Sequence, residues 1–270
     1  MTHRTVEPVE RARFDPGLEI EFLSDPMGFR YGPGVFGPKP EYRSLDAIRP
    51  SLRDPTCQGP DPVYAIAMDV GHHDDADDLR KRMLLFGVVM YAGGRLGDEP
   101  VRSQGHVHAI SPHSGWSAPE LFEIWEGSAI IYAQENSGDD PGRCLAIEAS
   151  PGDKVVMPPA WSHYVLNADT HSPLIFGAWC DSQYGFDYTA MRAHHGLAWF
   201  PRITKDDDIR WDANPNYSTS TLETRKARAY PELGLSSEWP IYANLRRDPQ
   251  SIQWVSEPAI LREIWPDFEP

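Results

Sequence analysis

Residues 63–190 consist of short apolar runs separated by turn residues, and this pattern constrains the fold more than any other feature of the sequence. The runs are rich in β-branched and aromatic residues, as in VYAIAMDV (63–70), MLLFGVVMYAGG (83–94) and LIFGAWCD (174–181). Glycine, proline and asparagine stand between them, and no amphipathic helical pattern intervenes. Such spacing predicts an all-β domain, a barrel or sandwich of antiparallel strands, and disfavours an α/β architecture.

The segments on either side of this domain have a different texture. Residues 1–62 are rich in proline and glycine, which predicts an arm that packs on the barrel. Residues 191–270 form a C-terminal extension, in which we expect short helices over 220–233 and 256–265. Because it carries five of the nine tryptophans, the extension should pack on the barrel or on a second subunit. Arm and extension together favour a homodimer.

Charge and composition limit the partners of the protein. The formal net charge of -15 argues against binding to nucleic acid or to an anionic membrane surface. The three cysteines show no pairing pattern, and the N-terminal residues do not resemble a secretion signal. No apolar run approaches the ~18 residues that a membrane span needs. These features favour a cytoplasmic protein that acts on a small molecule.

The stretch from Gly105 to His108, with sequence GHVH, carries the clearest chemical signal. Residues i and i+2 of a strand point to the same face, so His106 and His108 would present two imidazoles side by side. Glu120 opens a strand seven residues before Gly127, and His163 follows the Pro158-Pro159 corner. Three histidines and a carboxylate are ligands typical of a divalent metal.

These blocks resemble the two signature motifs of the cupin superfamily. Glu120-x6-Gly127 and Gly152-x5-Pro158-x4-His163-x3-Asn167 fit the spacing, and a longer loop over 109–119 explains the wide gap between His108 and Glu120. Within the cupins, residues 25–190 resemble the archaeal-type glucose-6-phosphate isomerase family. The resemblance implies a double-stranded β-helix, or jelly-roll barrel, with one divalent metal ion held by His106, His108, Glu120 and His163.

The same resemblance implies a sugar-phosphate pocket. Ser103, Gly105, Tyr64 and Tyr188 fall where the family binds its substrate, and Glu120, Tyr188 and Tyr64 are the candidates for proton transfer. Three positions depart from the family: Val89 replaces a threonine, Cys180 replaces a tyrosine, and the run that begins at Phe186 lacks the usual histidine. Loss of hydroxyl donors at Val89 and Cys180 would alter the phosphate site.

The implied reaction is the interconversion of glucose 6-phosphate and fructose 6-phosphate, or of a related sugar, through an enediolate or a hydride shift. The alternative is an Fe(II)-dependent oxygenase, since the same ligand set also serves oxygen chemistry. Apolar residues favour that alternative: Trp116, Trp125, Trp179, Val89 and Phe186, whereas Trp161 fits the family's own motif and counts for neither reading. Ligands of this kind admit Fe, Mn, Ni, Co or Zn.

Other polar clusters have simpler interpretations. His72 and His73 stand beside four aspartates, a pattern typical of a solvated loop. His194 and His195 lie beyond the barrel, where packing is the expected role. Alternation along the strand places Glu126 on the same face as Glu120, so geometry alone leaves Glu126 open as the acidic ligand.

Overall fold

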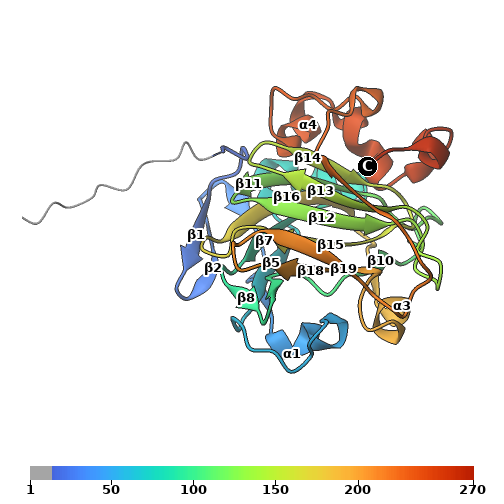
Figure 1. Cartoon of the computed structure of the whole chain (residues 1–270). Coiled ribbons are helices and arrows are strands. Elements are labelled where there is room, and N and C mark those ends of the chain that lie inside the picture. Colours follow the sequence, from blue (N-terminus) through green and yellow to red (C-terminus); the bar gives the residue numbers. More distant parts are fainter. Residues whose placement is uncertain (1–13) are drawn as a thin grey trace, which may run out of the picture.

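The structure is a computed structural model that describes residues 14–270. Two β-sheets pack face to face, with an apolar core between them (Figure 1). The six-stranded sheet has the order β14 (Lys154–Met157), β11 (Glu120–Glu126), β16 (Leu174–Asp181), β7 (Leu84–Tyr91), β5 (Tyr64–Met68) and β4 (Glu41–Arg43). The four-stranded sheet has the order β15 (Ser162–Asn167), β12 (Ala129–Gln134), β13 (Cys144–Ala149) and β20 (Leu222–Lys226). This confirms the predicted all-β fold class, the double-stranded β-helix.

The apolar runs of the sequence are the central strands of these sheets. Every residue of β7 and of β16 is buried, so both faces of the six-stranded sheet are covered. Val89 and Phe176 face the core between the sheets, whereas Phe86 and Trp179 face outward. A strand that is buried on both faces is apolar throughout, which explains why these runs lack polar alternation.

The C-terminal extension packs on both sheets: residues 230–268 cover the outer face of the six-stranded sheet, and residues 191–222 pack on the outer face of the four-stranded sheet. Its residues 241–267 form α4 (Ile241–Arg247) and three 3-10 segments, Pro249–Val255, Pro258–Leu261 and Trp265–Asp267. Trp179 Nε1 donates a hydrogen bond to the Ile241 carbonyl at 3.0 Å, and the Trp179 and Tyr242 rings stack at 5.4 Å. The extension therefore packs on its own barrel, where the orange and red segments lie in Figure 1.

Two expectations for the extension were wrong. Residues 222–226, expected in a helix, form β20, which pairs in parallel with β13. Residues 256–265 form 3-10 turns rather than one α-helix. In the first case the open edge of β13 offers backbone hydrogen bonds that outweigh local helix propensity. In the second, Pro258 starts a short 3-10 segment, its carbonyl accepts a hydrogen bond from Trp265 Nε1 at 2.8 Å, and the Trp265 ring packs edge-on against Trp254.

Both sheets also extend beyond residues 63–190. β4 comes from the N-terminal arm and pairs with β5, and β20 comes from the C-terminal extension. The remaining strands are short: β1 (Ile20–Ser24), β2 (Met27–Tyr31), β3 (Val35–Phe36), β6 (Gly71–His72), β8 (Arg95–Leu96), β9 (Glu99–Pro100), β10 (Val107–His108), β17 (Phe186–Asp187), β18 (Trp199–Ile203) and β19 (Ile209–Ala213). The other helices are α1 (Leu45–Ile48), α2 (Ala76–Lys81) and α3 (Thr189–Ala193), with 3-10 segments at Arg49–Ser51, His73–Asp75 and Pro231–Leu233. Within residues 14–270, no helix is long and apolar enough to cross a membrane.

Candidate metal centre and substrate pocket

Backbone pairing brings two of the predicted ligands together. His106 and His163 exchange hydrogen bonds, with N···O distances of 3.1 and 2.9 Å, at an isolated antiparallel bridge. His108 stands two residues after His106, and their rings lie 5.1 Å apart. Glu120 approaches from the first position of β11 in the opposite sheet. One candidate ligand atom from each of these four residues lies within 4.8 Å of the others.

The Glu120 carboxylate contacts three side chains. Its Oε2 lies 3.2 Å from His163 Nε2 and 3.3 Å from His108 Nε2, and its Oε1 accepts a hydrogen bond from Cys180 Sγ at 3.3 Å. Burial alone would raise the pKa of Glu120, but the contacts with His108 and His163 hold it well below its usual range. The carboxylate is therefore ionised at neutral pH, as a metal ligand must be.

The histidines are oriented as metal ligands require. The His108 Nδ1 atom lies 2.8 Å from the Ala118 carbonyl, which fixes the tautomer and leaves Nε2 free to face the cluster. Among the residues that the structure describes, the buried Nε2 atom of His106 has no hydrogen-bond partner, and that of His108 has only the Glu120 carboxylate, 3.3 Å away. Burial, together with His163 and His108, keeps the pKa of His106 well below its ordinary value, so this imidazole is neutral. Buried polar atoms without partners are rare, and a bound cation would satisfy both. The four residues fit a divalent metal.

The long loop between His108 and Glu120 supports this cluster. Ser117 Oγ donates to the His108 carbonyl at 2.7 Å and accepts a hydrogen bond from the Ala160 backbone at 3.0 Å. The Ala118 carbonyl orients the His108 ring. The eleven residues that separate the two motif positions thus hold His108 in place.

Glu126 does not join the cluster. A register shift between Ile124 and Glu126 breaks the strand alternation, and Glu126 lines a separate groove beside Phe14 and Trp125. Glu123 faces the C-terminal extension instead, where its Oε1 accepts a hydrogen bond from the Ile241 backbone.

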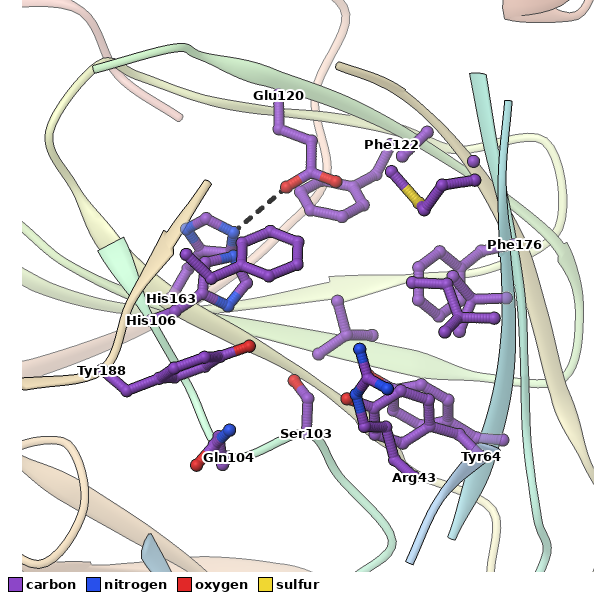
Figure 2. A pocket seen from close by; sticks show the side chains of 18 residues that line it. Arg43, Tyr64, Ser103, Gln104, His106, Glu120, Phe122, His163, Phe176 and Tyr188 are labelled. Atoms are coloured by element: carbon purple, nitrogen blue, oxygen red, sulfur yellow. Dashed lines mark hydrogen bonds and ion pairs between the residues drawn. The ribbon is translucent and has the colours of Figure 1, made fainter. Parts of the chain in front are cut away.

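The cluster opens into a pocket between the two sheets (Figure 2). Its polar lining residues, apart from the metal-site side chains, are Arg43, Tyr64, Ser103, Gln104 and Tyr188. Its apolar lining comes from Ile66, Met68, Val89, Phe122, Val165, Phe176, Ala178 and Phe186, and Gly87 and Tyr91 complete it. In Figure 2, Glu120 and the histidines lie on one side, and Arg43 and Tyr64 lie across the pocket from Glu120.

Most residues predicted to bind substrate line this pocket, but Gly105 does not. Ser103, Tyr64 and Tyr188 face it. Gly105 has φ +88°, and a Cβ there would come within 3.1 Å of Leu197. The role of Gly105 is therefore in the backbone that positions His106, because only glycine adopts this conformation without strain.

Three positions that depart from the family surround the same site. Val89 and Phe186 line the pocket, and Cys180 contacts Glu120. The tryptophans expected to contribute to an apolar pocket do not line it: Trp116, Trp125 and Trp179. Trp179 packs outward under the C-terminal extension, and Trp161 lies under the Arg143 guanidinium. Aliphatic and phenylalanine side chains supply the apolar lining in their place.

Sequence reasoning missed Arg43 and Gln104. Arg43 belongs to the N-terminal segment, and it reaches the pocket because it pairs with Tyr64 across β4 and β5. Gln104 adjoins Ser103 in sequence, and its Oε1 accepts a hydrogen bond from Arg192 at 3.3 Å. The Arg192 guanidinium also lies 4.9 Å from the centre of the Tyr188 ring. Motif signals fell on residues next to these two, on Tyr64 across the strand pair from Arg43 and on Ser103 and Gly105 beside Gln104, but not on Arg43 or Gln104 themselves.

The other histidine clusters have structural partners. His72 Nε2 lies 2.8 Å from the Gly17 carbonyl, and the nearby Asp75 accepts hydrogen bonds from Tyr242 and Arg246. His194 contacts Asp139 at 2.9 Å. In the part of the chain that the structure describes, neither cluster brings three ligands together.

Comparison with known proteins places the chain in a family. Residues 48–219, more than half of the chain, match the model of the family described as glucose-6-phosphate isomerase (GPI). The chain belongs to the glucose-6-phosphate isomerase family. This confirms the resemblance that the sequence motifs indicated, and the matched range contains the four clustered residues.

A curated relative of this GPI-family chain is a glucose-6-phosphate isomerase of Sinorhizobium medicae (strain WSM419), 28% identical over 136 residues. The alignment covers 50% of this chain and 58% of the relative, so it spans just over half of that protein. Among solved structures, an oxalate oxidase is 16% identical with a TM-score of 0.33, over 45% of this chain and 52% of that one. Hazelnut (Corylus avellana) vicilin is 12% identical with a TM-score of 0.35, over 48% and 33% of the two chains.

Proposed function

We propose that this protein is a metal-dependent aldose-ketose isomerase that interconverts glucose 6-phosphate and fructose 6-phosphate, or a closely related pair of sugars. The observation that carries the proposal is the cluster of His106, His108, Glu120 and His163 at the wall of a pocket, in a chain of the GPI family. In this proposal the enzyme is a cytoplasmic homodimer, as composition and the N-terminal arm favour.

The four clustered residues would hold one divalent cation, whose chemistry fits the reaction. A cation bound to them would polarise the substrate carbonyl and stabilise negative charge on its oxygen. Imidazoles bind a cation in their neutral form, so three of them and one carboxylate would leave it net positive charge, and such donors admit Fe, Mn, Ni, Co or Zn.

Isomerisation moves hydrogen between C1 and C2 of the sugar, either as a proton through an enediolate or as a hydride. Glu120 is one candidate to accept the proton, but its low pKa makes it a weak base. Tyr188 is the better placed of the two tyrosines, since its ring lies 6.1 Å from that of His106. Burial raises the pKa of Tyr188, while Arg43, Gln104 and Arg192 oppose this rise. The Tyr188 hydroxyl is therefore protonated at neutral pH, and we assign it the role of donating its proton to a reacting sugar oxygen, while the hydrogen on carbon passes to Glu120 as a proton or shifts directly as a hydride.

Tyr64 has a different place in the pocket. Its ring stacks on Tyr91 at 4.9 Å, beside Arg43 and across the pocket from Glu120 (Figure 2). Burial raises its pKa well above the ordinary value, so the hydroxyl remains protonated. We therefore assign Tyr64, with Ser103, to substrate binding.

A second candidate function is the Fe(II)-dependent oxygenase. The observation that favours it is the apolar band of Ile66, Val89 and Phe176 in the middle of the pocket, where a sugar would need hydrogen-bond donors. Oxygen consumption by the Fe(II)-loaded protein with a chelating substrate would support this alternative over isomerisation.

An isomerase assay tests the proposal. Protein loaded with a divalent metal should convert glucose 6-phosphate to fructose 6-phosphate, measured by NMR of the sugar mixture. His163→Ala should lose at least about 100-fold in activity, because it removes one ligand and a partner of Glu120. Chelation should abolish the activity of the wild type, and added metal should restore it.

His171→Ala is the matched control, because this histidine is 77% exposed and lies outside the pocket. Its activity should equal that of the wild type. A metal-loaded wild-type protein that leaves both hexose phosphates unchanged would contradict the assigned reaction, while leaving the metal site and the fold intact.

A further inference from the structure

The pocket has a second polar end, opposite the metal cluster. We propose that Arg43 binds an anionic group of the substrate, so that the substrate carries a phosphate or a carboxylate at the end remote from its metal-binding oxygens. This inference rests on the proposed function in one respect, that oxygens of the substrate bind at the metal end of the pocket. It adds a specificity-determining residue from the N-terminal segment, outside the range matched to the family.

Strand register defines the position of Arg43. Arg43 pairs with Tyr64, and Tyr64 pairs with Tyr91, so these three side chains form one row across β4, β5 and β7. Residues paired across strands point to the same face of a sheet. All three line the pocket. Arg43 therefore projects into the same space as the predicted substrate-binding tyrosine.

The next two rows along the sheet carry one charged side chain, the exposed Glu41 at the β4 edge, which pairs with Ile66 and does not line the pocket. Ile66, Val89 and Phe176 form the first of these rows, and Met68, Gly87 and Ala178 form the second. Cys180 follows two residues after Ala178 on β16, and it contacts Glu120. Each row step along a strand spans about 6.8 Å. The anion-binding end and the metal end are thus separated by an apolar band.

Arg43 is the only arginine or lysine among the described residues that line this pocket. Its guanidinium interacts electrostatically with Tyr64 and Tyr188. Within residues 14–270 it forms one ion pair, with Glu41 at 3.1 Å from Nη1, and the Glu41 side chain is 73% exposed. An exposed ion pair is weak, because water screens it. An anion bound inside the pocket would face the remaining N–H donors of the guanidinium, in a fork that suits phosphate and carboxylate alike.

The positive charge of Arg43 also offsets the repulsion between an acidic protein and an anionic substrate. The protein carries a net charge of -15, which repels an anionic substrate at long range. Hydroxyl donors that could bind the anion are missing at Val89 and Cys180. Arg43 supplies a charge-assisted donor in place of those hydroxyls, from the edge strand of the same sheet.

Calorimetry with three unreactive probes tests the inference on the purified wild-type protein. Glucitol 6-phosphate carries a phosphate. Gulonate is the aldonic acid that has a carboxylate in place of one terminal CH2OH group of glucitol, and glucitol itself is the neutral reference. None has a carbonyl group that could be isomerised. The wild type should bind at least one anionic probe about 10-fold or more tightly than glucitol. The tighter of the two anions identifies the group that the pocket selects.

Two substitutions should move anion affinity in opposite directions. Arg43→Met should abolish the preference for the anionic probe, and Glu41→Gln should tighten its binding about 2-fold to 5-fold by removing the competing carboxylate. Arg80→Met is the control, because Arg80 is 75% exposed, pairs with Asp77 and lies outside the pocket. It should bind all probes as the wild type does. Far-ultraviolet circular dichroism checks that each variant is folded.

Three results would overturn the inference. These are a wild type that binds neither anion more tightly than glucitol, an Arg43→Met variant that keeps the preference, and a Glu41→Gln variant that weakens it. If Arg43→Met does not fold, the Glu41→Gln result decides. Anion binding that depends on Arg43, in a protein that isomerises no sugar phosphate, would contradict the proposed reaction while supporting this inference.

Discussion

Neighbouring residues of strand β11 point to opposite faces of the six-stranded sheet. Glu120 and Phe122 face the pocket, whereas Glu123 points outward beneath the C-terminal extension. Glu123 Oε1 accepts a hydrogen bond from the Ile241 backbone at 2.9 Å, and Lys154 Nζ lies 3.8 Å away. Burial raises the pKa of Glu123 to about 7, against the opposing effect of Lys154. The two carboxylates of one strand therefore differ in charge state because their surroundings differ.

The stability of the protein should report this raised pKa. Because the folded pKa of about 7 exceeds the ordinary 4.5, the contribution of Glu123 to stability is fully present below pH 4.5 and declines as the pH rises through 7. The stability of the wild type relative to Glu123→Gln should therefore fall between pH 5 and pH 8, by about 2 kcal/mol. Urea unfolding at several pH values measures the difference.

An exposed glutamate on β13 provides the control for this titration. Glu148→Gln should leave the pH dependence of stability unchanged. A difference between the wild type and Glu123→Gln that stays constant, or that grows in favour of the wild type with rising pH, would contradict the assignment.

Some residues of the site could be predicted from the sequence, and others could not. His106, His108, Glu120 and His163 stand at fixed spacings on neighbouring strands, so a local pattern predicted that they would meet. Arg43 reaches the pocket only through the pairing of β4 with β5. That contact links segments some twenty residues apart through a proline-rich stretch, where no periodicity indicated a strand.

At the scale of elements, the loop of residues 109–119 behaves as part of the metal site. Ser117 links it to the His108 carbonyl and to the Ala160 backbone, and both contacts are buried or partly buried. The loop therefore fixes the strand end that carries His108. The long loop between the two motif positions, residues 109–119, therefore helps to position the candidate metal ligand His108.

Ser117→Ala should weaken both the fold and the metal site. Loss of the hydroxyl leaves a buried carbonyl and a backbone N–H without a partner, which should lower the free energy of unfolding by about 1–2 kcal/mol. Because His108 is then less well held, metal affinity should fall about 10-fold. Denaturant unfolding and a metal titration measure the two effects.

Ser114→Ala is the matched control in the same loop. Among the described residues, the Ser114 hydroxyl has one hydrogen bond, which it accepts from the Trp116 backbone N–H at 3.3 Å, and it does not contact His108. This variant should keep wild-type metal affinity. If Ser117→Ala binds metal as tightly as Ser114→Ala does, the loop does not position His108.

Element prediction succeeded where burial on both faces made a strand wholly apolar, as in β7 and β16. It failed for residues 222–226, where the sequence LETRK gives no apolar alternation. Pairing with β13 determines that strand, and this partner lies about eighty residues away. A local pattern cannot contain such information, because the hydrogen bonds that decide the outcome come from another part of the chain.

At the scale of the whole molecule, the candidate metal site joins the two sheets. Glu120 belongs to the six-stranded sheet, and His163 belongs to the four-stranded sheet. The C-terminal extension covers the opposite face of the six-stranded sheet, and Arg43 reaches the pocket from its far edge strand. Barrel, arm and extension therefore all contribute to the surroundings of one pocket.

The metal content of the protein tests the central claim most directly. Elemental analysis of protein purified without added metal should find about one divalent ion per chain in the wild type and in His171→Ala. His163→Ala should contain little or none, because one of four ligands is lost. A wild-type protein without bound metal, which also fails to take up Fe, Mn, Ni, Co or Zn on dialysis, would contradict the assignment of His106, His108, Glu120 and His163 as a metal centre.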